Sequence, residues 1–363
     1  MKAIVPVAGA GVRLRPHTYT QPKPLILVAG KPIISFIIDQ LITGGVDEFV
    51  FVLGYLGEKI KDYLDKAYPD LHKTYVYQSV RRGLGDAILH TRDEVINEKE
   101  LIVLLGDTIV DLDIKKFMGQ KGSSIAIQKV DDPRQFGVVE EGVNNEIVRV
   151  VEKPSIPKSN LAIVGLYKFA DVPELFKALE SVKVETEEDG SEIHLTNGMM
   201  KMIENDVSFT SFEVNNWYDC GKKEILLETN KVLLSRNVAD VGTQFVFDHS
   251  IIIPPVVYGK SCSFENAIIG PNVTLGDNVK ISNSLLKNSI LGDYVEIKGA
   301  VLTDSVIGND AIIKGLSQSL NIGDNNEIDF TKWFSIVSIV DLPIQLDLVQ
   351  LWHIDDTLDK LFL

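Results

Sequence analysis

One short motif recurs at nearly constant spacing in the last third of this 363-residue chain, and it restricts the fold more than any other feature. Its copies are Leu275–Val279, Leu291–Val295, Ile307–Ala311 and, more weakly, Ile322–Asn325, at spacings of 16, 16 and 15 residues. Each copy begins with an aliphatic residue and a glycine, and the first three copies have another aliphatic residue six positions later. A unit this short cannot bury its apolar side alone, so it must stack on its neighbours.

The six-residue step predicts a solenoid of short parallel strands over residues 245–330, with about four or five coils. The aliphatic residue is expected to point inward at each corner, and the small residue after it to permit the turn. This pattern resembles a left-handed parallel β-helix, whose full triangular coil takes about 18 residues, so a repeat of 16 implies one shortened side. The alternative is a run of unrelated short strands.

The last residues of the chain, 331–363, leave this register. They contain a strand-like run, Trp333–Val340, followed by apolar residues among acidic ones. Because the open end of a solenoid exposes unpaired backbone groups, we expect this tail to be a cap or a contact between subunits. The chain is therefore expected to form a homo-oligomer through the β-helix and this tail.

Residues 1–240 follow a different pattern, in which apolar runs alternate with segments of helical spacing. The runs predict strands over Ala3–Val7, Phe49–Leu53, Thr74–Gln78 and Leu101–Leu105, and helical spacing is found in 34–41, 56–64 and 86–97. Strand–helix alternation of this kind predicts a Rossmann-like α/β domain, with a mostly parallel sheet and helices on both faces. Ligands bind such sheets at the carboxyl ends of the strands.

The charge balance narrows the range of partners. Lysine and arginine number 36 against 51 acidic residues, a net charge of −15. Such a surface repels nucleic acid and anionic lipid, so we expect small-molecule substrates, with any phosphate site built from local cations, backbone amides or a metal ion. The chain has two cysteines, which are too few for a disulfide framework. No run reaches the ~18 apolar residues of a membrane helix, and the first residues do not form a signal peptide, so we expect a cytoplasmic protein.

A turn with two glycines follows the first predicted strand. Gly9 and Gly11 can aim backbone N–H groups at phosphate oxygens, and Arg13 and Lys23 add nearby cations. A dinucleotide-binding fingerprint would need a third glycine where Leu14 stands, and a Walker loop would need Gly-Lys-Ser/Thr. Taken alone, the two glycines would favour an ordinary tight turn.

The wider pattern around this turn resembles the sugar nucleotidyltransferases, also called nucleotide-sugar pyrophosphorylases. The matching features are Gly9-x-Gly11-x-Arg13-Leu14-x-Pro16, Pro22–Leu25 and Lys31-Pro32. Members of the family usually carry threonine where this chain has Val12, so one hydroxyl contact to phosphate is expected to be missing. The resemblance continues, in order, through the first ~235 residues.

This resemblance implies a nucleotide site and a magnesium ion. The residues implied for nucleotide binding are Ala8, Gly9, Ala10, Gly11, Gln78, Gly83 and Asp107, and those implied for catalysis are Arg13, Lys23 and Lys153. A glutamine amide can donate and accept at once, as the imide edge of uracil or thymine requires. Asp107 and Asp219 are implied to hold Mg²⁺, which prefers one or two carboxylates together with phosphate oxygens. A lone aspartate after a strand is more often a helix cap.

The resemblance also implies a sugar 1-phosphate site. Its residues would be Gly137, Glu152, Lys153, Ile163 and Trp217, with Glu152 accepting from sugar hydroxyls and Lys153 pairing with the phosphate. The segment 191–197 resembles a family segment near the sugar, with Asn197 in place of the usual aspartate.

The reaction that this resemblance implies is NTP + sugar 1-phosphate → NDP-sugar + pyrophosphate. The segment after Asp219 and the C-terminal repeats are similar to long-form glucose-1-phosphate thymidylyltransferases, whereas the short phosphate loop is closer to UTP–glucose-1-phosphate uridylyltransferases. We favour dTTP, with UTP as the alternative. Two other hypotheses are a non-catalytic nucleotide-sugar sensor and a second, acetyl-transferring activity of the β-helix. The short solenoid and its lack of histidine between 250 and 352 disfavour the acetyl-transferring activity.

Overall fold

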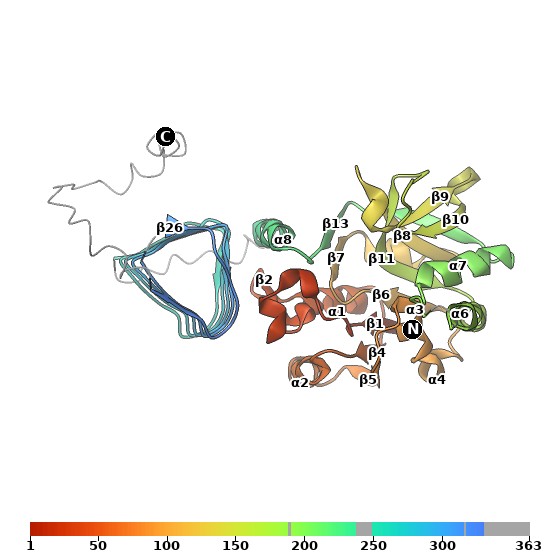
Figure 1. Cartoon of the computed structure of the whole chain (residues 1–363), viewed down its shortest axis with the longest axis horizontal. Coiled ribbons are helices and arrows are strands. Elements are labelled where there is room, and N and C mark those ends of the chain that lie inside the picture. The colour runs from red at the N-terminus through yellow and green to blue at the C-terminus, as the bar shows by residue number, and fades with distance from the viewer. Residues whose placement is uncertain (188–189, 237–248, 316, 330–363) are drawn as a thin grey trace.

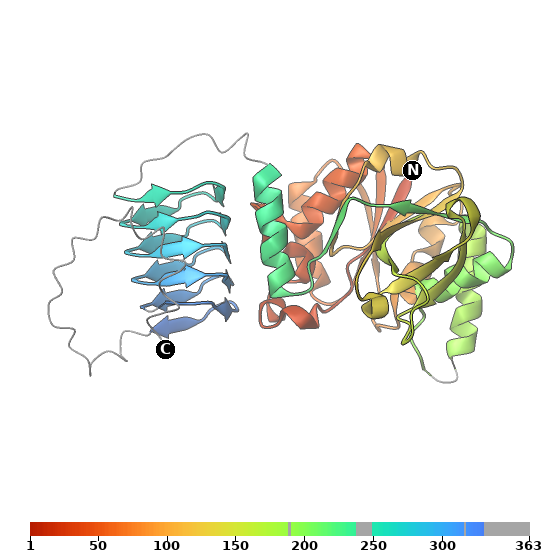
Figure 2. The same cartoon turned by 90° about the horizontal axis from the view of Figure 1, so that it is seen from above.

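The computed structural model describes residues 1–187, 190–236, 249–315 and 317–329. They form two bodies, an α/β domain and a three-sided β-helix, with one helix, α8 (Lys223–Arg236), lying between them (Figures 1 and 2). The predicted tail, 331–363, lies outside the described residues. None of the described helices is long and apolar enough to cross a membrane.

A nine-stranded mixed sheet forms the centre of the α/β domain. Along its main path the order is β10-β9-β11-β6-β1-β4-β5; off this path, β8 pairs with β11 and β12 pairs with β8. Strand β1 runs parallel to β4 and β6, whereas β11 runs antiparallel to β6, β8 and β9. The strands are β1 (Lys2–Pro6), β4 (Glu48–Leu53), β5 (His72–Tyr77), β6 (Leu101–Leu104), β8 (Ser123–Lys129), β9 (Gly137–Glu141), β10 (Ile147–Glu152), β11 (Leu161–Phe169) and β12 (Phe209–Glu213).

Helices cover both faces of this sheet, which confirms the predicted α/β architecture. Because successive strand residues point to opposite faces, Ala3 and Val5 join one core with helices α1 and α2, and Ile4 joins the other with α3, α6 and α7. The helices of the domain are α1 (Ile33–Thr43), α2 (Gly57–Ala67), α3 (Leu84–Leu89), α4 (Arg92–Val95), α5 (Ile114–Met118), α6 (Val172–Thr186) and α7 (Leu195–Glu204).

Smaller elements complete the domain and bring distant segments together. Strand β7 (Thr108–Asp111) pairs antiparallel with β13 (Asn216–Asp219), and β2 (Leu27–Val28) pairs with β3 (Lys31–Pro32). Single turns of 3-10 helix are found at Val12–Leu14 (η1), His17–Tyr19 (η2), Lys23–Leu25 (η3), Pro133–Gln135 (η4) and Val143–Asn145 (η5). The helical spacing over 86–97 belongs to two short helices, because the chain leaves α3 at His90 and restarts as α4 at Arg92.

The C-terminal body is a β-helix with three parallel sheets of five strands each, seen end-on as a triangle in Figure 1. The first sheet contains β14 (Ile251–Ile252), β17 (Ile268–Ile269), β20 (Leu285–Lys287), β23 (Val301–Thr303) and β26 (Ser317–Gln318). The second contains β15 (Val256–Tyr258), β18 (Val273–Leu275), β21 (Ser289–Leu291), β24 (Val306–Ile307) and β27 (Asn321–Ile322). The third contains β16 (Ser263–Glu265), β19 (Lys280–Ser282), β22 (Glu296–Lys298), β25 (Ile312–Lys314) and β28 (Glu327–Asp329). The solenoid prediction is confirmed.

The repeated Gly-Asp pair acts between coils. Asp277, Asp293, Asn309 and Asp324 each accept a hydrogen bond from a backbone N–H of the preceding coil, at 2.7–2.8 Å. A Cβ atom on Gly292 would lie 2.1 Å from Asn309 Oδ1, and Gly259, Gly276 and Gly308 are equally crowded. The glycine is therefore required by the close approach of the next coil, and the left-handed turn residue lies two positions later, for example at Tyr294 (φ 58°).

The two bodies are joined by polar contacts. Asn230 of α8 is fully buried, and its Oδ1 accepts from Ala29 N at 2.9 Å and from Thr274 Oγ1 at 2.6 Å. A second contact lies nearer the amino-terminal loop, where a ring nitrogen of His17 is 2.7 Å from Asn321 Oδ1. Thr20 donates to Asp324 beside it. The β-helix thus contacts the segment that directly follows the predicted phosphate loop.

Candidate active site

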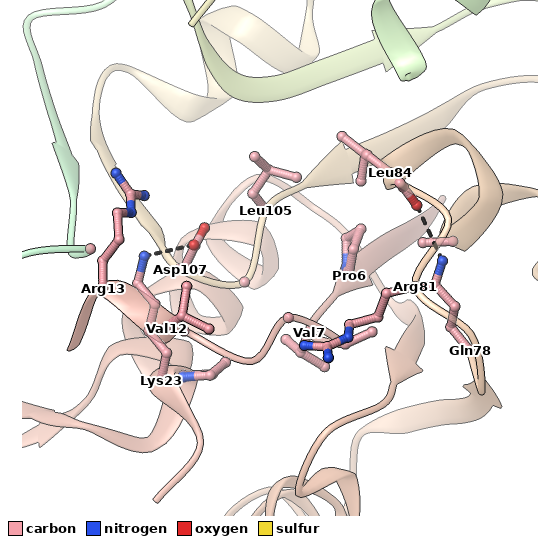
Figure 3. Close-up of a pocket in the computed structure, with 18 of the residues that line it drawn as sticks. Pro6, Val7, Val12, Arg13, Lys23, Gln78, Arg81, Leu84, Leu105 and Asp107 are labelled. Atoms are coloured by element: carbon pink, nitrogen blue, oxygen red, sulfur yellow. Dashed lines mark hydrogen bonds and ion pairs between the residues drawn. The ribbon is translucent and has the colours of Figure 1, made fainter. Parts of the chain in front are cut away.

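A pocket of about 430 Å³ opens in the α/β domain at the carboxyl ends of β1 and β6, the edge where a ligand is expected. Figure 3 shows side chains from several separate segments around it. The predicted residues that line it are Ala8, Gly9, Gly11, Arg13, Lys23, Gln78, Gly83 and Asp107. Ala10 and Asp219 do not line this pocket, although Asp219 is ion-paired to two residues that do.

The two glycines of the predicted phosphate loop have different functions. Gly11 adopts a left-handed conformation with φ +59°, and a Cβ there would lie 2.9 Å from Thr18 Cγ2. Thr18 also donates its hydroxyl to the Gly11 carbonyl at 2.9 Å, which fixes the turn. A Cβ on Gly9 would meet no atom within 4 Å, so Gly9 leaves open space beside the pocket. Only Gly11 is needed for the fold of the loop.

A cluster of four charged residues lies at one end of the pocket. Lys23 Nζ is 2.7 Å from Asp107 Oδ2 and 3.1 Å from Asp219 Oδ1, and Arg13 Nη2 is 3.0 Å from Asp219 Oδ2. The β7–β13 pair explains the meeting, because it sets Asp219 opposite Thr108, the residue after Asp107. The two acids predicted to act together are therefore adjacent, although they are 112 residues apart in the sequence.

The ion pairs keep this cluster charged. Burial disfavours the charged form of Lys23, but Asp107 and Asp219 outweigh that cost and raise the pKa of the ammonium. Burial likewise disfavours the Asp107 carboxylate, but the ion pair with Lys23 outweighs it and lowers the pKa of Asp107. Lys23 is 95% buried, so its charge is held by these partners and the pocket rather than by bulk water.

The same two carboxylates could supply ligands to a divalent metal. Within the part of the chain that the structure describes, no group of three or more histidine, cysteine, aspartate or glutamate residues could hold a metal by itself. Mg²⁺ is usually bound by one or two carboxylates together with substrate phosphates. Asp107 and Asp219 beside the predicted phosphate loop fit that arrangement.

The predicted base-reading segment is tightly fixed. Gln78 is buried, and its Nε2 donates to the Gly83 carbonyl at 3.2 Å and to Asp86 Oδ2 at 2.7 Å. Gly83 has φ +100°, and a Cβ on it would lie 2.7 Å from the Ile193 carbonyl oxygen. Both hydrogens of the Gln78 amide are used inside the protein, which differs from the expectation that it both donates and accepts toward a base.

Four of the predicted sugar residues form a second group on β9, β11 and the end of β10. Gly137 and Glu152 are register partners, and a Cβ on Gly137 would lie 3.1 Å from Ile163 Cδ1 and 3.5 Å from Glu152 Oε2. Lys153 has φ +39° and pairs with Glu152 at 3.1 Å. The structure thus brings four of the five predicted sugar residues together.

Trp217, the fifth predicted sugar residue, reaches this group through an aromatic contact. Its ring packs edge-to-face on Phe136, the neighbour of Gly137, with centroids 4.6 Å apart. Its indole Nε1 is buried and has no hydrogen-bond partner among the described residues.

Sequence reasoning missed three residues at these sites. Arg81 and Glu192 line the pocket, and Thr196 donates its hydroxyl to Glu152 Oε2 at 3.0 Å. The adjacent arginines after Gln78, in an acidic chain, were a usable signal for Arg81. Thr196 lies in a segment already matched to the family, but its partner Glu152 is 44 residues away and could not be read from the sequence.

The chain is similar to known proteins over its α/β domain. The model of the nucleotidyl transferase family matches residues 2–236. The chain is 36% identical over 242 residues to the bifunctional protein GlmU of Methanocaldococcus jannaschii, covering 66% of this chain and 56% of that protein. It is 30% identical over 319 residues to a glucose-1-phosphate thymidylyltransferase of Streptomyces antibioticus, covering 80% of this chain and 86% of that enzyme.

A solved structure supports the fold of the α/β domain. A UDP-glucose pyrophosphorylase complexed with UDP-glucose matches 65% of this chain and 98% of its own, with a TM-score of 0.58 and 24% identity. The chain spans only 56 to 66% of the length of the first curated relatives that it matches.

Proposed function

This chain belongs to the nucleotidyl transferase family, and from that premise we propose that it joins a nucleoside triphosphate to a sugar 1-phosphate and releases pyrophosphate. The cluster of Lys23, Asp107 and Asp219 at the end of the pocket carries this proposal. Transfer of a phosphorus group needs little covalent help from a protein and depends on positioning and charge neutralisation. A buried lysine between two carboxylates, beside a loop with open space at Gly9, suits that task.

The proposed reaction is an in-line displacement. A phosphate oxygen of the sugar 1-phosphate attacks the α-phosphorus of the nucleotide, a new P–O bond forms, and the bond from the α-phosphorus to the bridging oxygen breaks with pyrophosphate leaving. Arg13 and the backbone of Gly9–Gly11 hold the departing pyrophosphate, and Lys23 stabilises charge at the α-phosphate. Lys153 orients the attacking phosphate, and Glu152, fixed by Thr196, accepts from sugar hydroxyls.

Asp107 and Asp219 are the residues that would hold Mg²⁺. When bound, such an ion neutralises charge on the transferring group. The same carboxylates form ion pairs with Lys23 and Arg13, so these two cations balance their charge.

For substrates, we propose glucose 1-phosphate and dTTP, with UTP as the alternative. The thymidylyltransferase of Streptomyces antibioticus supports dTTP, because its similarity extends over 80% of this chain. Thymine and uracil differ by one methyl group, worth about 1–3 kcal/mol in a pocket, so a site that accepts one base can accept the other.

The proposal is tested by pyrophosphate release from purified protein with Mg²⁺ and glucose 1-phosphate, offering dTTP, UTP, CTP, ATP and GTP separately. Release with dTTP or UTP is expected, and the ratio of the two kcat/KM values decides between thymidylyltransferase and uridylyltransferase. No release with any nucleotide, together with binding of a nucleotide-sugar, would support a sensor instead.

A further inference from the structure

Two pure acceptors fix the orientation of the Gln78 side chain. Its Nε2 contacts the carbonyl oxygen of Gly83 and a carboxylate oxygen of Asp86, and neither group can donate. The atom that faces them must therefore be the amide nitrogen, whichever way the amide was first placed. Figure 3 shows this nitrogen turned toward the backbone oxygen next to Leu84.

The fixed orientation leaves one polar atom of Gln78 for a ligand. Both amide hydrogens are used, and Oε1 has no hydrogen-bond partner within the residues that the structure describes. Gln78 lines the pocket, so a ligand there faces a hydrogen-bond acceptor at this position. The amide cannot rotate to present its NH₂ group instead. Asp86, 94% buried on α3, makes the shorter of the two contacts, 2.7 Å against 3.2 Å.

We propose that Asp86 is a positioning residue that determines nucleobase specificity, because it holds the Gln78 amide with its oxygen toward the base. This inference rests on the proposed function, which places a nucleobase in the pocket. An acceptor selects a base edge that carries an N–H group. Uracil and thymine present N3–H, whereas N3 of cytosine carries a lone pair and would oppose Gln78 Oε1.

Such a mismatch is costly, because two acceptors then face each other without a hydrogen bond. A site built to pair with a substrate N–H group can reject the analogue that lacks it by several orders of magnitude. If the amide could rotate, its NH₂ group would pair with cytosine N3 and the rejection would disappear. Asp86 therefore provides selectivity without touching the nucleotide.

The test measures dissociation constants of UTP, dTTP and CTP by titration calorimetry, with Mg²⁺ and without sugar phosphate. The wild-type protein is expected to bind UTP and dTTP at least about 100-fold more tightly than CTP. In Asp86→Ala the ratio of the CTP to the UTP dissociation constant should fall to within about tenfold. Asp86→Asn keeps the volume of the side chain but can offer Gln78 either a donor or an acceptor, so it should give an intermediate ratio. It replaces the alanine variant in the test if that variant does not fold.

His90→Ala is the matched control, because His90 is the other side chain paired with Asp86, at 3.5 Å, and it does not touch Gln78. It should leave the ratio unchanged. A merely structural role for Asp86 would weaken all three nucleotides alike, and an unchanged ratio in both Asp86 variants would overturn the inference. So would a wild-type protein that binds CTP as tightly as UTP.

The outcomes also separate this inference from the proposed function. Selective binding of UTP and dTTP that depends on Asp86, without pyrophosphate release from any sugar phosphate, would support the inference and contradict the function. Turnover with an unchanged ratio in the Asp86 variants would do the reverse. No binding of any nucleotide would contradict both.

Discussion

The α/β domain and the β-helix use similar residues over very different distances along the chain. In the β-helix, each aspartate or asparagine of the repeat caps the coil directly before it, 15 to 17 residues away. In the α/β domain, Lys23 meets partners that lie 84 and 196 residues away. The β-helix is therefore a sum of nearly equal local contacts, whereas the candidate site exists only when the whole domain is folded.

This difference predicts how each body responds to a single substitution. A change in one coil should affect the stability of that coil and its neighbours and leave chemistry untouched. A change in the charged cluster should affect chemistry far more than folding. The expected effects below run from the largest to the smallest.

The largest effect is expected in the α/β domain for Lys23→Ala. The variant removes the cation between Asp107 and Asp219, and kcat should fall about 10²- to 10³-fold, as for the loss of one charge-stabilising donor. Pyrophosphate release measures kcat, and a thermal melt checks that the protein is folded. Lys66→Ala, an exposed lysine on α2, is the control and should keep full activity. Undiminished turnover in Lys23→Ala would contradict the assignment.

The next largest effect is expected in the β-helix for Gly292→Ala. The added Cβ would lie 2.1 Å from Asn309 Oδ1, and such overpacking costs about 1–3 kcal/mol. Hydrogen exchange of peptides from residues 249–329 should show faster opening around this coil, with kcat unchanged. Gly299→Asn is the control, because its position has φ +64° with open space around it and asparagine tolerates that conformation. A loss of activity in Gly292→Ala as large as that in Lys23→Ala would remove the distinction between the two bodies.

A smaller effect is expected at the contact between the bodies, where His17 meets Asn321. Burial lowers the pKa of His17 below its usual value near 6.5, although the hydrogen bond that His17 donates to Asn321 Oδ1 and the charge of Asp324 oppose this. A lowered pKa means that the unfolded chain binds the proton more readily, so the stabilisation is complete above about pH 6.5 and is lost as the pH falls below it.

Thermal melts at pH 7.5 and 5.5 measure this effect. The wild-type Tm should fall by a few degrees more than the Tm of His17→Gln, since glutamine can bond Asn321 without titrating. The same pH dependence in both proteins would show that His17 is not responsible.

The smallest effect is expected for Arg81→Met at the rim of the pocket. Arg81 is exposed and has no ion-pair or hydrogen-bond partner among the described residues, so it is available to a nucleotide phosphate or carbonyl. Nucleotide affinity at low salt should fall about two- to fivefold, and less at high salt, as for an exposed charge pair. Arg82→Met is the control, because Arg82 is exposed but does not line the pocket. Equal losses in the two variants would mean that only general charge matters.

The sequence predicted the β-helix more completely than the site, for a physical reason. The Leu-Gly-Asp repeat records contacts between adjacent coils, so the period alone predicts the stacking of the three sheets. Even so, the reason for the glycine was wrong, because Gly292 is needed for the approach of Asn309 and not for a turn. The approach of a neighbouring coil becomes visible only in three dimensions.

The candidate site could be predicted residue by residue only through resemblance to a family. Nothing local to Asp107 indicates that Asp219 will lie beside it, since the β7–β13 pairing brings them together. Local spacing also could not show that Gln78 has both amide hydrogens occupied, because that depends on how the loop folds back onto α3. The strand ends were predictable, but the hydrogen bonds between them were not.

The central claim, that the chain transfers a nucleotidyl group onto a sugar 1-phosphate, is tested most directly with an isotope. The substrate is glucose 1-phosphate with ¹⁸O in the oxygen that bridges carbon 1 and phosphorus, incubated with Mg²⁺ and dTTP or UTP. Mass spectrometry and ³¹P NMR should find the label in the nucleoside diphosphate glucose and none in the released pyrophosphate, because the C–O bond of the sugar stays intact. Product without the label, with ¹⁸O in inorganic phosphate, would contradict the claim, and so would the absence of product with either nucleotide.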